Sequence, residues 1–174
     1  MVTVAVARVA GTLTVARLLL AVLISVALAA DRLLLGAVTL VCGWTTDTVD
    51  GFFARKAPGV TRLGQWDATI DGMVGVGLMV GLVLSGSVPV AWLIVVLALA
   101  GLLVFAGSAA SGMLLQGISY GWLLWILAER DTGALILVLT AIALVAIVHG
   151  RRVPRVLLPK FFADVARLKG IRRG

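Results

Sequence analysis

The stretch DTVDGFFARKAPGVTRLGQWDATID, residues 47–71, places four aspartates in an otherwise strongly apolar chain. Asp47 and Asp50 are three residues apart, and Asp67 and Asp71 are four apart, so the members of each pair share one face of a helix. Carboxylates in a hydrocarbon environment are costly and repel each other unless positive charge compensates them. Because oxygen ligands gathered in this way suit hard divalent cations, the stretch predicts a site for one or two such ions.

The composition of the whole chain indicates the medium that surrounds this stretch. Of 174 residues, 61% are hydrophobic and 13% are charged, and the mean hydropathy is +1.15. A soluble core of this size cannot hide so much apolar surface, so we expect the lipid bilayer to be the solvent for most of the chain. Cys42 is the single cysteine, which excludes a disulfide within the chain.

Six apolar segments predict an all-α membrane protein, a bundle of six transmembrane helices. Turn-forming and charged residues separate the segments. The predicted spans are 13–30, 33–53, 65–84, 88–106, 113–128 and 133–148. Short interfacial segments are expected at both termini, over residues 1–11 and 160–169. No repeat and no second-domain boundary is visible, so residues 1–174 are predicted to form one domain.

The basic residues predict the orientation of this bundle. The chain has a formal net charge of +7, and thirteen of its 15 Lys and Arg residues lie on one side of the predicted membrane, with Arg32 and Arg130 on the other. By the positive-inside rule, both termini and both aspartate pairs then lie on the cytoplasmic side of the cell (inner) membrane. Because the basic residues flank apolar segments, nucleic acid is not expected as a partner.

The residues within and between the two aspartate pairs resemble a known signature. It is the pattern of the CDP-alcohol phosphatidyltransferase family, integral membrane enzymes that make phospholipids. Its eight positions are matched in residue type by Asp47, Asp50, Gly51, Ala54, Arg55, Gly64, Asp67 and Asp71. The family pattern has three residues between Gly64 and Asp67, whereas this chain has two. Both offsets lie near the same face of a helix, so the glycine is rotated rather than lost. Thr14 and Arg17 are also similar to a threonine and an arginine near the start of the family's first helix.

The resemblance implies an enzyme that transfers a phosphatidyl group from CDP-diacylglycerol to an alcohol acceptor and releases CMP. The implied cofactors are two Mg²⁺ ions, with Mn²⁺ as a substitute. The implied metal ligands are Asp47, Asp50, Asp67 and Asp71. Asp71 is in addition the implied catalytic general base. The residues implied to bind the CDP moiety are Gly51, Ala54, Arg55 and Gly64. A homodimer in contact with membrane lipid is also implied.

The acceptor alcohol is not specified by the signature. Members of this family use glycerol 3-phosphate, inositol phosphate, serine or a second lipid. The basic character of the predicted cytoplasmic edge favours a phosphorylated polyol, glycerol 3-phosphate or inositol phosphate. Its phosphate could bind Arg17, Arg55, Arg62 or the arginines of the C-terminal tail.

Other interpretations remain open at the level of sequence. An acidic ring in a helix bundle also suits a divalent-cation channel or transporter, although such sites tend to lie near the membrane midplane. A family member that has lost catalysis and persists as a structural membrane protein is a further alternative. An intramembrane aspartate can also be the ion-pair partner of an arginine in its own bundle. The tryptophans are expected at membrane interfaces or in packing.

Overall fold

Six α-helices make up all of the regular structure in the described part of the chain. The computed structural model describes the backbone of residues 2–56 and 64–149, and within these ranges the side chains of 15–46, 69–108 and 110–147. The helices are α1 (Val2–Ala29), α2 (Leu33–Lys56), α3 (Gly64–Leu84), α4 (Val90–Ala106), α5 (Ala109–Arg130) and α6 (Thr132–His149). The prediction of an all-α protein with six helices is confirmed.

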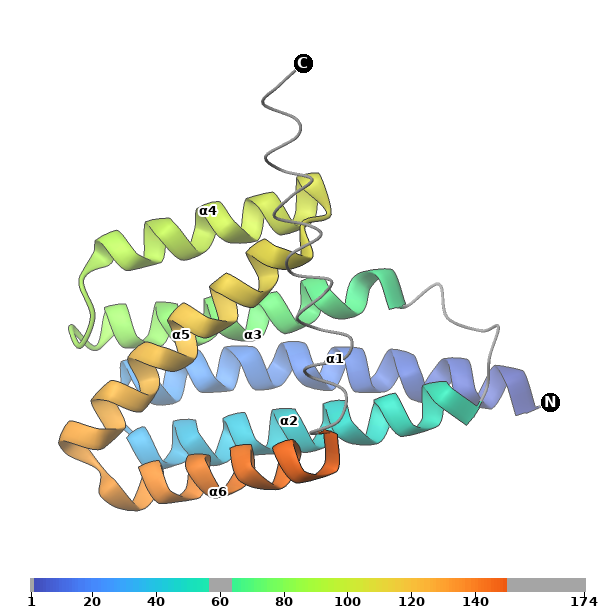
Figure 1. The fold of residues 1–174 in the computed structure, drawn as a ribbon, viewed down its shortest axis with the longest axis horizontal. Coiled ribbons are helices and arrows are strands. Elements are labelled where there is room, and N and C mark those ends of the chain that lie inside the picture. Colours follow the sequence, from blue (N-terminus) through green and yellow to red (C-terminus); the bar gives the residue numbers. More distant parts are fainter. Residues whose placement is uncertain (1, 57–63, 150–174) are drawn as a thin grey trace.

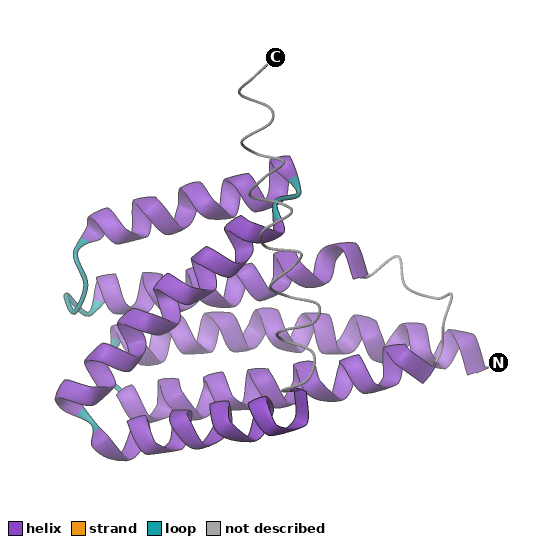
Figure 2. Cartoon of the chain, viewed as in Figure 1, coloured by secondary structure: helices purple, strands orange, loops and turns teal. Residues whose placement is uncertain are grey.

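The arrangement of the helices is centred on α1, which has α2 on one side and α3 on the other (Figure 1). α4 packs against α3, α6 packs against α2, and α5 crosses the bundle obliquely to contact α3, α4 and α6. The described connections are short loops (Figure 2). The C-terminal half of α2 and the first turns of α3 lie toward the same end of the bundle (Figure 1). This end therefore carries the backbone of both aspartate pairs.

Two glycines allow α3 to pack directly on the backbone of α1. A Cβ atom built on Gly77 would lie 2.6 Å from the carbonyl oxygen of Ala21, and one built on Gly81 would lie 2.6 Å from that of Ser25. Glycines four residues apart permit such close approach between helices. α1 and α3 run in the same direction (Figure 1). The contact therefore fixes their register, and Arg17, one turn before Ala21, lies against α3.

The outer surface of the described helices carries many large apolar side chains. Leu78 and Leu82 of α3 are completely buried, yet Phe105 of α4 is 92% exposed and Ile147 of α6 is 79% exposed. Within the described residues, one helix, 110–130, is long and apolar enough to cross a membrane, and the other helices contain apolar runs of 10–17 residues. The number of spans therefore stays a prediction.

The start of the chain differs from the expected arrangement. A separate interfacial segment over residues 1–11 was predicted, but α1 runs without a break from Val2 to Ala29. The apolar and small residues of 1–11 include no proline, so nothing there interrupts helical hydrogen bonding. The interfacial helix predicted at 160–169 lies outside the described residues.

The start of α5 also differs from the prediction, because a serine cap begins the helix before the predicted span. The fifth span was expected at 113–128, and α5 begins at Ala109. Gly107, with φ 61°, ends α4 in the left-handed conformation, as glycine commonly does after a helix. Ser108 then caps α5, since its Oγ accepts a hydrogen bond of 3.3 Å from the Ser111 backbone N–H.

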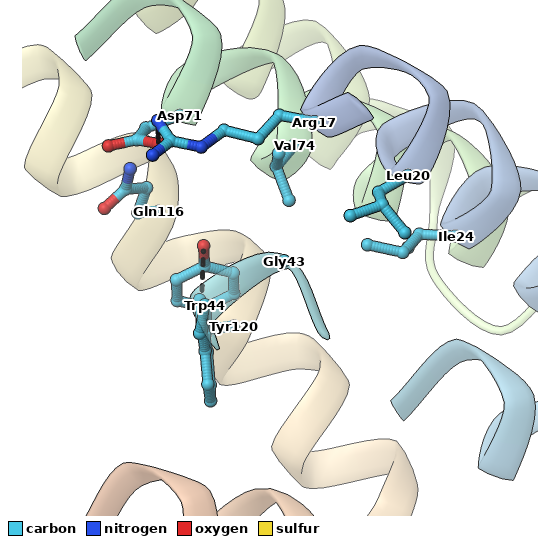
Figure 3. Close-up of a pocket in the computed structure, with 9 residues that line it drawn as sticks. All are labelled: Arg17, Leu20, Ile24, Gly43, Trp44, Asp71, Val74, Gln116 and Tyr120. Carbon is cyan, nitrogen blue, oxygen red and sulfur yellow. Dashed lines mark hydrogen bonds and ion pairs between the residues drawn. The ribbon is translucent and has the colours of Figure 1, made fainter. Parts of the chain in front are cut away.

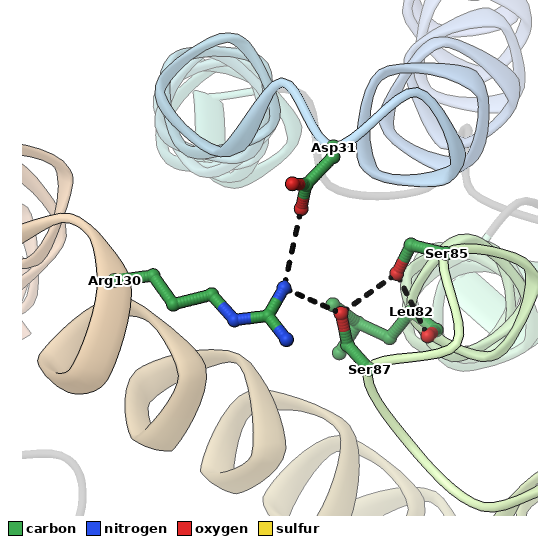
Figure 4. A network of polar contacts seen from close by, with 5 residues as sticks. All are labelled: Asp31, Leu82, Ser85, Ser87 and Arg130. Carbon is green, nitrogen blue, oxygen red and sulfur yellow. Dashed lines mark hydrogen bonds and ion pairs between the residues drawn. The ribbon is translucent and has the colours of Figure 1, made fainter.

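The end of the bundle opposite the aspartate pairs is held by polar contacts between its turns. The Arg130 guanidinium at the end of α5 donates to Asp31 Oδ1 at 3.4 Å and to Ser87 Oγ at 3.2 Å (Figure 4). Asp131 ends α5 through its backbone N–H, which donates to the Leu127 carbonyl at 2.9 Å. Its Oδ1 also accepts from the Ala134 N–H at 2.9 Å, which caps α6.

Candidate active site

The backbone of the predicted site residues lies on two helices, toward the same end of the bundle. Positions 47–55 belong to α2, and positions 64–71 belong to the first turns of α3. Of the eight predicted site residues, Asp71 is the one whose side chain the structure describes. The side chains predicted to bind metal and CDP at Asp47, Asp50, Gly51, Ala54, Arg55, Gly64 and Asp67 lie outside the described part, so their roles remain predictions.

Asp71 forms an ion pair with a buried arginine of α1. The Arg17 Nη1 and Asp71 Oδ1 atoms are 3.7 Å apart, and the two side chains are 3% and 35% exposed (Figure 3). A guanidinium buried to this extent requires a compensating negative charge, and Asp71 supplies it. The pair depends on the register of α1 and α3 that Gly77 and Gly81 set.

A cavity of about 120 Å³ adjoins this ion pair between α1, α2, α3 and α5. We refer to it as the interhelical cavity. Among the described residues, its polar lining consists of Arg17, Trp44, Asp71, Gln116 and Tyr120, and its apolar lining of Leu20, Ile24 and Val74, with Gly43 beside Trp44. In Figure 3 the side chains of Arg17 and Gln116 lie close to the Asp71 carboxylate. The cavity therefore contains hydrogen-bond donors and acceptors beside the Asp71 carboxylate, toward the end of the bundle that carries the aspartates.

An aromatic contact holds α2 against α5 at this cavity. The Trp44 Nε1–H donates to the Tyr120 hydroxyl at 3.4 Å, and the two rings meet edge to face with centroids 5.5 Å apart. Trp44 lies three residues before Asp47. The contact thereby positions the segment of α2 that leads into the first aspartate pair.

Three of the polar groups at the cavity were not singled out from the sequence as site residues. Gln116 and Tyr120 are four residues apart on α5 and therefore share a face. A polar pair at this spacing in an apolar helix is the signal that could have identified them. Trp44 was assigned only to an interface or to packing, and no sequence pattern links it to Tyr120, which is 76 residues away.

Asp71 is the described side chain at the predicted metal site. No group of three or more His, Cys, Asp or Glu side chains suited to a metal occurs among the side chains that the structure describes, which include that of Asp71 but not those of Asp47, Asp50 or Asp67. A partly exposed carboxylate that lines a cavity is an oxygen ligand of the kind that Mg²⁺ prefers. Asp71 fits a divalent ion in chemistry and in access.

The comparison with protein families assigns the chain. The model of the CDP-alcohol phosphatidyltransferase family matches residues 7–151. The protein belongs to this family. Comparisons with curated proteins and with solved structures found no match.

Membership of the family gives the class of chemistry. Its members are phosphotransferases of phospholipid biosynthesis that transfer a substituted phosphate group from a CDP-alcohol to an acceptor alcohol. They are generally membrane-associated and use divalent metal ions. The matched region begins within α1 and extends past the end of α6 at His149. It therefore includes both aspartate pairs and the interhelical cavity.

Proposed function

We propose that the protein transfers a phosphatidyl group from CDP-diacylglycerol to an alcohol acceptor and releases CMP, with Asp71 as the general base. The observation that carries this proposal is the position of Asp71 at a cavity that is lined in part by polar groups and is large enough to admit a small molecule. The carboxylate is 35% exposed, so a substrate hydroxyl can reach it. A general base must lie within hydrogen-bond reach of the proton that it takes.

The reaction transfers one group and one proton. The acceptor hydroxyl oxygen attacks the phosphorus atom that carries the diacylglycerol and forms a new P–O bond. The bond between this phosphorus and the CMP oxygen breaks, and CMP leaves with the electron pair. The hydroxyl proton passes to the Asp71 carboxylate. Charge develops on the phosphate oxygens and on CMP, and positive groups must stabilise it.

The four aspartates would supply the metal ligands of this reaction. Asp47 and Asp50 from α2, with Asp67 and Asp71 from α3, would hold two Mg²⁺ ions, or Mn²⁺ ions in their place. When bound, such ions neutralise diphosphate charge and make the phosphorus more electrophilic. Arg17 lies beside Asp71 in the structure, and its role is to keep that carboxylate compensated and oriented.

The nucleotide would bind along the C-terminal half of α2 and the start of α3. Gly51 and Ala54 carry little or no side chain, so a ligand could approach the helix backbone closely there. Arg55 offers a planar set of donors to a phosphate. Gly64 at the start of α3 completes the proposed CDP site. Its two-residue separation from Asp67 rotates it slightly about the helix axis relative to the usual pattern.

The membrane placement is part of the proposal. Large exposed apolar side chains are distributed over all the described helices, more than a water-facing surface normally carries. We infer that the six helices span the cell (inner) membrane as one domain and that the termini and the aspartates are cytoplasmic. Thirteen of the 15 basic residues would then lie inside. We also propose a homodimer, which the resemblance to the family implies.

The acceptor is proposed to be a phosphorylated polyol, glycerol 3-phosphate or inositol phosphate. The basic cytoplasmic edge favours an anionic acceptor. The test uses purified protein, CDP-diacylglycerol and Mg²⁺ with each of glycerol 3-phosphate, inositol phosphate and serine, and it measures CMP and lipid product. We expect CMP release with a phosphorylated polyol. CMP release with serine and with neither polyol phosphate would contradict this acceptor class.

The role of Asp71 is tested with the variant Asp71→Asn, and Asp31→Asn is its matched control. Asp31→Asn removes an aspartate that is 64% exposed at the opposite end of the bundle, and it should leave CMP release unchanged.

The same assay separates the alternative functions. Absence of CMP release by wild-type protein, together with Mg²⁺ uptake into vesicles that contain it, would favour the transporter interpretation. Absence of both activities would favour a structural role.

A further inference from the structure

We propose that the contact between Trp44 and Tyr120 is a positioning device for metal binding, because it fixes the direction in which α2 carries Asp47 and Asp50 toward the second aspartate pair. The inference rests on the proposed function and adds two positioning residues to it. Its evidence is the packing of α2, a weak point in this helix just before the first aspartate pair, and the place of Tyr120 on α5.

The two helices that carry the aspartate pairs pack on different neighbours. Among the described residues, α2 packs mainly against α1 and α6, whereas α3 packs against α1, α4 and α5. The start of α2 is held tightly on α1, since a Cβ atom built on Gly36 would lie 2.6 Å from Leu28 Cδ2. This start lies at the end of the bundle opposite the aspartates (Figure 1). The direction of α2 near the aspartates therefore depends on contacts made further along the helix.

The segment of α2 just before the first aspartate pair is a weak point of the helix. Packing does not require Gly43, since a Cβ atom built on it meets no atom within 4 Å, and glycine weakens a helix interior. The Thr45 hydroxyl donates to the Cys42 carbonyl, and the Thr46 hydroxyl donates to that of Gly43, each at 2.7 Å. Such bonds compete with the hydrogen bonding of the helix and often bend it.

A small bend at this point would be enough to disturb a metal site. At about 1.5 Å per residue, position 50 lies about 10 Å beyond Gly43 along α2, so a bend of about 10° displaces it by about 2 Å. Metal–ligand distances hold to within about 0.2 Å. Metal binding therefore requires one direction of α2, and a contact that favours this direction raises the apparent affinity for the metal.

The contact with α5 supplies such a restraint. The Trp44 Nε1–H donates to the Tyr120 hydroxyl at 3.4 Å, and the two rings pack edge to face (Figure 3). Position 47 is three residues beyond Trp44 and therefore lies on the same face of α2. One turn before Tyr120 on α5, the side chain of Gln116 lies close to the Asp71 carboxylate (Figure 3). α5 is thus a common reference for the two aspartate pairs.

The first test measures metal binding in the absence of turnover. The probe is Mn²⁺, titrated into purified protein without substrate and followed by the electron paramagnetic resonance signal of the free ion. Trp44→Phe and Tyr120→Phe each remove the hydrogen bond and keep an aromatic ring. One neutral hydrogen bond supplies a factor of about threefold to tenfold, so the apparent Kd for Mn²⁺ should rise by this factor in each variant. The double variant should bind no more weakly than the weaker single variant, because both changes remove the same contact.

Trp92→Phe is the matched control. Trp92 at the start of α4 and Trp122 on α5 form another edge-to-face contact, with ring centroids 5.7 Å apart. The start of α4 lies at the end of the bundle opposite the aspartates (Figure 1). Trp92→Phe should therefore bind Mn²⁺ with the wild-type Kd. A thermal melt in EDTA verifies that each variant is folded, and a merely structural role of Trp44 would lower the melting temperature without changing the Kd.

The second test uses the catalysed reaction. The Mg²⁺ concentration for half-maximal CMP release should rise about threefold to tenfold in Trp44→Phe, by the same hydrogen bond. At saturating Mg²⁺, kcat should stay within about twofold of the wild type, because excess ion shifts the protein to the direction of α2 that binds it.

The outcomes separate this inference from the proposed function. The inference is overturned if Trp44→Phe and Tyr120→Phe retain the wild-type Kd for Mn²⁺ and the wild-type Mg²⁺ requirement, or if Trp92→Phe changes both as much as they do. In either case CMP release by the wild type would still support the transferase. If the wild-type protein neither binds Mn²⁺ nor releases CMP, the proposed function fails and the positioning role fails with it.

Discussion

The ion pair between Arg17 and Asp71 is expected to couple α1 to α3 energetically, and a double-mutant cycle can measure this coupling. The facing nitrogen and oxygen atoms are 3.7 Å apart. At an effective dielectric constant of about 20, two unit charges at this separation attract by about 4 kcal/mol. Asp71 is 35% exposed, so solvent screening reduces the net coupling, which we expect to be about 1–3 kcal/mol.

The two single variants of the cycle should differ in stability. Asp71→Asn removes a negative charge beside a guanidinium that is only 3% exposed, whereas Arg17→Met removes a positive charge beside a carboxylate that reaches solvent. Removal of one partner from a fully buried pair costs about 3–5 kcal/mol. For this partly exposed pair we expect about 2–3 kcal/mol for Asp71→Asn and about 1 kcal/mol for Arg17→Met.

The assay is reversible unfolding in mixed micelles, with EDTA present, for the wild type, both single variants and the double variant. Helical circular dichroism against denaturing detergent gives the free energy of unfolding of each. We expect the double variant to be less destabilised than the sum of the single variants by the coupling energy. Additivity within about 0.5 kcal/mol would refute the claim that the two residues interact.

Three further predictions concern packing and the ends of the helices. Gly77→Val places a Cβ atom 2.6 Å from the Ala21 carbonyl oxygen, so a thermal melt should show a loss of about 2–3 kcal/mol in the free energy of unfolding. Stability equal to the wild type would mean that α1 and α3 are not in close contact. Asp131→Ala removes the bond from its Oδ1 to the Ala134 N–H and should cost about 0.5–2 kcal/mol in chemical unfolding, with no change counting against the cap. Arg130→Gln breaks an exposed pair, 47% and 64% exposed, so its cost should stay below about 1 kcal/mol; a larger loss of melting stability would show that this network is more important than its exposure suggests.

The helices were predictable from the sequence because hydropathy changes sharply at their ends. The helix boundaries were less predictable where a single side chain determines them. Ser108 and Asp131 each cap a helix through a hydrogen bond to the backbone three residues on, and the sequence also permits a turn at such residues. The expected break after residue 11 did not occur, since helix formation continues through apolar residues that offer no competing structure.

The aspartates of the candidate site were identified from the sequence, but the residues that pack around Asp71 were identified only in part. The spacing of the aspartates led to the family that the family model then confirmed. The partner of Asp71 was not specified, because Arg17 reaches it through the packing of Gly77 and Gly81 on α1. Long-range register of this kind leaves no local pattern in the sequence. The contact of Trp44 with Tyr120 was missed for the same reason.

The measurement that tests the account most directly is the rate of CMP release from CDP-diacylglycerol by wild-type and Asp71→Asn protein, assayed side by side with Mg²⁺ and glycerol 3-phosphate. The account predicts release by the wild type in equal amount to the lipid product. It predicts a rate at least about 100-fold lower in Asp71→Asn, the usual contribution of a general base, in protein that a melt shows to be folded. Equal rates in the two proteins would contradict the assignment of Asp71 as the base.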